Sequence, residues 1–125
     1  PAIEALDRSL FLQTLVYFSS SVQTAFQLDY HSDRFAHTPA DEPSAKRRGQ
    51  RRLSETWRII DDQIGDNKWI LGEKFSAADI YLFMLTTWLD PSRGHPEISN
   101  FPNIQRIANA VMLRPSVQTV YGNTK

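Results

Sequence analysis

The 125-residue chain carries 14 basic and 14 acidic side chains, and this balance gives no overall field that would favour nucleic acid or an anionic membrane. It contains no cysteine, which excludes disulfides and thiolate chemistry, and its three histidines, His31, His37 and His95, lack the spacing of metal ligands. No apolar run reaches the roughly 18 residues of a membrane span, so we expect one cytoplasmic domain without a metal ion.

A long first helix is predicted from about residue 3 to residue 30. Residues that fit one helix face recur every four positions, namely Leu6, Leu10, Thr14, Phe18, Val22 and Phe26. The three serines at 19–21 weaken helix propensity at mid-length and predict a bend. The polar stretch from residue 31 to residue 42 predicts a loop, in which we expect His31 and His37 to be exposed.

The second helix is predicted to start near Pro43, which a first helical turn tolerates. Leu53, Trp57 and Ile64 lie on its apolar stripe, and Gly65 is a suitable residue just past its end.

A basic cluster lies within this helix and comprises Lys46, Arg47, Arg48, Arg51 and Arg52. Such a cluster concentrates a local field that could attract an anion or nucleic acid, but no aromatic residues interleave it as in single-strand binding. A solvated helix face and a subunit interface are the other two interpretations, and the solvated face is favoured.

The segment from Phe75 to Ile80 has the pattern of a strong helix start. Ser76 and Asp79 have the spacing of a capping box, and Phe75 and Ile80 that of a hydrophobic staple. The helix that follows, to about Leu89, is apolar on nearly every side, which predicts an almost entirely buried central helix. Because the capping role already engages both polar side chains, we expect no catalytic role for them.

The last part of the chain predicts a helix from near Pro102 that the Arg114–Pro115 pair breaks, followed by a short helical turn. No segment shows the sustained alternation of a β-strand. The predicted fold class is all-α, an antiparallel helical bundle around the helix that starts at Ser76.

Four sequence features in one order carry a resemblance to a known family. They are Trp69-Ile70-Leu71, then Gly72-Glu73-Lys74-Phe75-Ser76-Ala77-Ala78-Asp79-Ile80, then Phe101-Pro102-Asn103-Ile104, and finally Arg114-Pro115-Ser116-Val117. In this order they resemble the C-terminal α-helical domain of cytosolic, bacterial-type glutathione S-transferases, and the resemblance covers residues 1–125.

The resemblance implies a division of labour between two domains. In the family, a thioredoxin-like N-terminal domain binds glutathione and carries the residue that stabilises its thiolate. No βαβ pattern of that domain is visible, so we expect the domain and every catalytic residue to lie outside this chain. Glutathione is then a co-substrate of the parent enzyme, and no cofactor is bound by this chain alone. The implied partners are the thioredoxin-like domain, a second copy in a homodimer and a hydrophobic electrophile.

The family's helical domain supplies one wall of the electrophile pocket, mainly from its first helix and the following loop. Carried onto this sequence, the candidate pocket residues are Tyr17, Ser21, Gln23, Phe26, Tyr30 and Arg34. The beta class often has a Glu-Leu-His run in this helix, where Ser21-Val22-Gln23 stands here. Gln23 in place of that histidine argues against the beta class.

A non-enzymatic function is the main alternative. The same helical domain occurs in translation-factor and synthetase-associated proteins that resemble glutathione transferases, where it serves as a protein-interaction module. The domain that accompanies this chain would discriminate the two functions.

Overall fold

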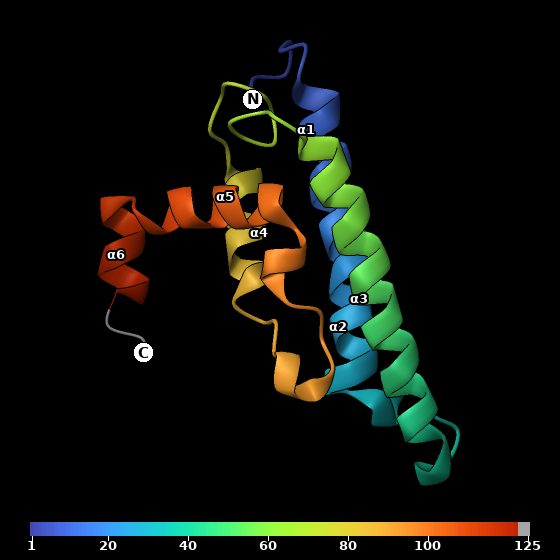
Figure 1. The fold of residues 1–125 in the computed structure, drawn as a ribbon. Helices are drawn as coiled ribbons and strands as arrows, with labels where there is room; N and C mark the ends of the chain where they lie inside the picture. Colours follow the sequence, from blue (N-terminus) through green and yellow to red (C-terminus); the bar gives the residue numbers. More distant parts are fainter. Residues whose placement is uncertain (123–125) are drawn as a thin grey trace.

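The computed structural model of the chain describes residues 1–122, whose backbone forms six α-helices. They are α1 (Arg8–Tyr17), α2 (Gln23–Tyr30), α3 (Glu42–Ile64), α4 (Ala77–Thr86), α5 (Pro102–Met112) and α6 (Pro115–Tyr121). The described residues contain no β-strand, so the predicted all-α fold is confirmed (Figure 1). None of the helices in this part of the chain is both long and apolar enough to cross a membrane.

The first two helices form one rod, joined by a π-helical turn over Phe18–Val22. The turn coincides with the serine run that predicted a bend. There the Ser20 hydroxyl donates to the carbonyl of Val16 at 2.6 Å, and such a bond competes with the helical backbone pattern. The rod begins at Arg8 rather than near residue 3, because the residues before it form turns with bonds spanning three residues.

Helix α3 runs antiparallel to this rod and packs closely against α2 (Figure 1). Gly49 lies at the crossing and is buried. A Cβ atom there would lie 2.8 Å from both the carbonyl oxygen of Ala25 and the Cβ of Leu28, so a larger residue would force the helices apart. The core beside the crossing holds the fully buried side chains of Leu53 and Trp57.

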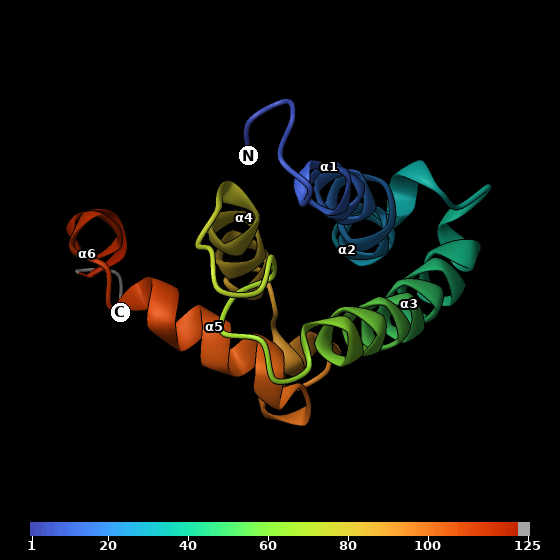
Figure 2. The same ribbon diagram turned by 90° about the horizontal axis from the view of Figure 1, so that it is seen from above.

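Helix α4 lies in the middle of the domain, between the α1–α2 rod and helices α5 and α6 (Figure 2). It ends at Thr86 rather than at the predicted Leu89. The hydroxyls of Thr86 and Thr87 donate to the carbonyls of Phe83 and Met84, at 2.6 Å each. The next backbone N–H groups bond three residues back instead of four, which tightens and closes the helix.

The prediction that α4 is almost entirely buried is wrong on one side. Leu82 and Leu85 are fully buried, but 46% of Ile80 is exposed. Phe75, its predicted staple partner, packs against the ring of Trp69 at 4.9 Å and beneath the guanidinium of Arg114 at 3.8 Å. The staple contact itself stays a prediction.

The start of α4 is held by the fully buried carboxylate of Asp79. The backbone N–H groups of Ser76 and Ile70 both donate to it at 2.9 Å, and the Ser76 hydroxyl accepts from the N–H of Ala78 at 3.2 Å. Burial raises the pKa of Asp79, although these backbone hydrogen bonds act in the opposite direction. One side chain therefore joins the helix start to the segment that precedes it.

A second buried carboxylate, that of Asp61 on α3, caps helix α5. It accepts from the backbone N–H groups of Asn103 and Ile104 at 2.9 Å each. Phe101, which precedes α5, offers no side-chain cap of its own. The cap from α3 therefore supplies the bonds that the helix start lacks locally.

Candidate ligand cavity

A cavity of about 470 Å³ lies between α2 and the end of α4, and we call it the α2–α4 cavity. It is lined by Gln23, Phe26, Gln27, Tyr30, His31, Arg34, Thr87 and Trp88. The structure thus brings four of the six candidate pocket residues to one place, because successive turns of α2 carry Gln23, Phe26 and Tyr30 on the same side.

Three aromatic side chains give this cavity a fixed wall. The rings of Phe26 and Tyr30 are stacked with centroids 6.2 Å apart, and Trp88 meets Phe26 edge-on at 5.5 Å. The Tyr30 hydroxyl donates to the carbonyl oxygen of Trp88 at 2.6 Å. Burial raises the pKa of Tyr30, while the nearby Arg93 acts to lower it, so the phenol stays protonated at neutral pH and keeps this bond.

Gln23 is oriented by a contact from α4. The hydroxyl of Tyr81 donates to its side-chain oxygen, and burial raises the pKa of Tyr81. The side-chain NH₂ group of Gln23 makes no hydrogen bond within residues 1–122, and it remains as a donor at the cavity.

The other two candidates, Tyr17 and Ser21, lie elsewhere. Tyr17 lines a second cavity of about 370 Å³ between α1 and α3, which we call the α1–α3 cavity. Burial raises the pKa of Tyr17, against the effect of the Arg52 charge. Ser21 is half-buried in the π-helical turn and lines neither cavity.

Sequence reasoning missed a buried polar cluster that lies behind Tyr30. One carboxylate oxygen of Asp29 accepts from Nε2 of His95 and from Nε of Arg93, at 2.8 Å each. Burial alone would raise the pKa of Asp29, but the hydrogen bonds from Arg93 and His95 and the charge of Arg93 hold it below its usual value. The Arg93 guanidinium also lies 4.5 Å from the centre of the Tyr30 ring, so the cluster supports the cavity wall.

The histidine of this cluster has both ring nitrogens engaged. Its Nδ1 accepts the backbone N–H of Asp90 at 2.9 Å, so Nε2 carries the proton that is donated to Asp29. A turn that ends at Gly94 directs His95 inward. Gly94 has φ +92°, which favours glycine, and a Cβ there would meet the Gln50 amide at 2.9 Å. The arrangement leaves the imidazole of His95 no free lone pair, so this side chain has a structural role.

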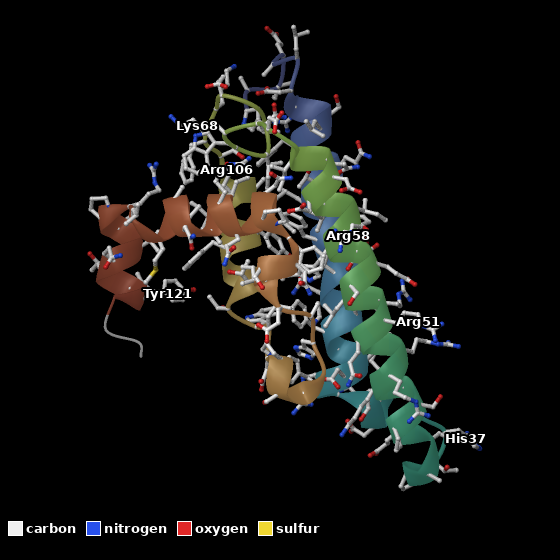
Figure 3. All side chains as sticks on the ribbon, in the orientation of Figure 1. His37, Arg51, Arg58, Lys68, Arg106 and Tyr121 are labelled. Carbon is white, nitrogen blue, oxygen red and sulfur yellow. The ribbon has the colours of Figure 1, made fainter. Side chains whose placement is uncertain are left out.

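The other polar residues singled out in the sequence lie away from the α2–α4 cavity or at its rim. His37 and Arg51 project outward from the lower half of the domain (Figure 3). His31 and His37 are exposed, as are the four arginines of the basic cluster. No group of three or more possible metal ligands occurs among residues 1–122.

The fold and the cavity define an all-helical domain with an aromatic-walled cavity, and comparison with known proteins assigns its family. Residues 16–115 match the sequence model of the glutathione S-transferase C-terminal domain. The chain therefore belongs to the glutathione S-transferase C-terminal domain family. No curated protein matches the sequence significantly.

Three solved bacterial structures have the same fold. A glutathione transferase homologue from Sulfitobacter, with bound glutathione, is 21% identical at a TM-score of 0.84, over 96% of this chain and 57% of that chain. BphK, a bacterial glutathione transferase in a ternary complex, is 25% identical at a TM-score of 0.78, over 95% of this chain and 55% of that chain. A beta-class glutathione S-transferase from Sphingomonas chungbukensis is 25% identical at a TM-score of 0.77, over 98% of this chain and 56% of that chain.

The chain therefore spans a little more than half the length of these structures. The domain bounds of 1–125 stay a prediction, as does the assignment outside the beta class.

Proposed function

We propose that this chain is the helical half of a cytoplasmic glutathione transferase, and that the α2–α4 cavity binds its electrophilic substrate. The observation that carries the proposal is the convergence of Gln23, Phe26, Tyr30 and Arg34 on one cavity, within a domain of this family. Neither the family model nor the similar structures favour the non-enzymatic interaction module.

In the proposed reaction, the glutathione sulfur forms a bond to an electrophilic carbon, and the leaving group departs with its bonding electrons. A thioredoxin-like partner domain binds glutathione and stabilises its thiolate. The aromatic wall of the α2–α4 cavity holds the second substrate near that sulfur and excludes water from it. Trp88 contributes to this wall from the end of α4.

The test is conjugation of 1-chloro-2,4-dinitrobenzene to glutathione. The 125-residue chain alone is expected to give no rate above the uncatalysed reaction, and conjugation at enzymatic rates by the chain alone would contradict the proposal. In the protein that joins this chain to its thioredoxin-like domain, Trp88→Ala is expected to raise KM for the electrophile about tenfold and leave KM for glutathione unchanged. Val120→Ala, at an exposed apolar position on α6 outside the α2–α4 cavity, is the control and should change neither constant.

We further propose that the chain forms a homodimer through α1 and the facing part of α3. Helix α1 buries none of its residues fully, and Leu10, Val16 and Ile59 on these helices are each more than 40% exposed. Apolar surface of this kind favours association. Light scattering is expected to give twice the chain mass of 14.4 kDa.

Charged substitutions locate that interface. Val16→Glu is expected to shift the chain toward the monomer, whereas Val120→Glu, at an exposed position on α6, should leave the dimer intact. A wild-type chain that remains monomeric at high concentration would refute the dimer.

A further inference from the structure

The shape of the α2–α4 cavity favours a flat ligand. Phe26 and Tyr30 present stacked rings with an interplanar angle of only 17°, and Trp88 stands at 81° to Phe26. The hydrogen bond from Tyr30 to the Trp88 carbonyl fixes the wall before any ligand arrives. A planar aromatic molecule can pack against such a wall without reordering it, which lowers the entropic cost of binding.

The charged side chain that lines the cavity is the cation Arg34, and the lining includes no aspartate or glutamate. The Arg34 side chain makes no hydrogen bond or ion pair within residues 1–122, so its guanidinium has five donors available. The adjacent carboxylate of Asp33 is exposed to solvent.

The nearest buried acid does not cancel this charge at the cavity. Asp29, on the same helix as Tyr30, gives its carboxylate to Arg93 and His95. Its negative charge is thus already paired, and the amide NH₂ of Gln23 adds a further uncommitted donor at the cavity.

We propose that the α2–α4 cavity selects planar aromatic molecules that carry a carboxylate, with the ring against Tyr30 and Trp88 and the carboxylate paired with Arg34. The inference rests on the proposed function, because it defines the class of electrophile that this cavity would take. A guanidinium binds a carboxylate through two parallel hydrogen bonds, which neutral aromatics of the same shape cannot form.

The test compares 2-naphthoate with its neutral counterpart 2-naphthamide in binding to the 125-residue chain, followed by amide NMR at neutral pH. Naphthoate is expected to bind about fivefold more tightly, with shifts confined to the cavity residues. Arg34→Met should abolish this preference and leave the affinity for naphthamide unchanged, while Arg34→Lys should retain part of it. Arg47→Met, an exposed arginine of α3 outside the cavity, is the matched control and should behave as wild type.

Equal affinity for the two probes, no binding of either, or a preference that survives in Arg34→Met would each overturn the proposal. The measurement needs neither glutathione nor catalysis, so its outcome is independent of the conjugation assay. A protein that conjugates neutral electrophiles but shows no naphthoate preference would retain the proposed function and lose this inference.

Discussion

Replacing Asp29 with alanine is expected to lower the free energy of unfolding by about 3–5 kcal/mol. The substitution removes the acceptor for His95, whose side chain is fully buried, and for the Nε of Arg93. A buried donor without a partner pays its desolvation cost in full, and Arg93 can recover only partly by turning to water. Urea denaturation followed by circular dichroism measures the change.

Two further variants separate charge from geometry in this cluster. Asp29→Asn keeps a carbonyl oxygen that both donors can reach, so the free energy of unfolding should fall by less, about 1–2 kcal/mol. Asp33→Ala removes an exposed carboxylate four residues along the chain and should change stability by less than about 0.5 kcal/mol. If Asp29→Ala matched Asp33→Ala, the cluster would not stabilise the domain.

The pH dependence of this cluster has a definite sign. The pKa of Asp29 is lower in the folded chain than its usual 3.8, so the unfolded chain binds more protons between the two values. The stabilisation from the charged carboxylate is therefore complete above 3.8 and is lost as the pH falls through the folded-state pKa. The stability gap between wild type and Asp29→Asn should narrow over that acid range.

The order and type of the helices could be predicted from the sequence because their signals are local. The stripe of Leu53, Trp57 and Ile64 lies on one face of α3, and Gly65 follows the helix end with φ +50°. The predicted helix bounds are wrong where contacts distant in sequence, or contacts made by side chains, determine where a helix ends. The end of α4 depends on the hydroxyls of Thr86 and Thr87, whose competition with the helix has no strong sequence signature.

The cavity was partly predictable, since three of its residues recur along α2. Thr87 and Trp88 were missed because they reach the cavity only through the fold, from the residues just past the end of α4, which is distant in sequence. The buried cluster has one local signal. Asp29 continues the spacing of Val22 and Phe26 on an apolar face, and a carboxylate at such a position requires a partner. The sequence does not identify that partner as His95, which lies 66 residues away.

Replacing Asp79 with alanine is expected to cost about 2–4 kcal/mol. The carboxylate accepts from Ser76, as in many helix starts, and also from the buried N–H of Ile70, nine residues earlier. Loss of the first bond weakens the cap, and loss of the second leaves a buried donor without a partner. The melting temperature of the variant measures the sum of the two effects.

The chain supplies a matched control, because Thr38 and Asp41 form the same capping box on the surface. Both residues are exposed, and the Asp41 carboxylate accepts from the N–H of Thr38 at 3.2 Å. Asp41→Ala therefore removes a cap without stranding a buried donor, and should cost no more than about 1 kcal/mol. If Asp79→Ala and Asp41→Ala lowered the free energy of unfolding equally, the hydrogen bond from Ile70 would contribute nothing to stability.

The pH profile provides a second discrimination, with a sign opposite to that of Asp29. Because burial raises the pKa of Asp79, its folded form binds more protons than the unfolded chain between 3.8 and the folded-state value. The contribution of Asp79 is then fully present below 3.8 and declines as the pH rises through that window. The difference in the free energy of unfolding between wild type and Asp79→Ala should therefore be largest in acid. If this difference in the free energy of unfolding instead became smaller in acid, the pKa of Asp79 would be lowered in the folded chain. Favourable interactions of the charged carboxylate would then outweigh the cost of its burial, as they do at Asp29.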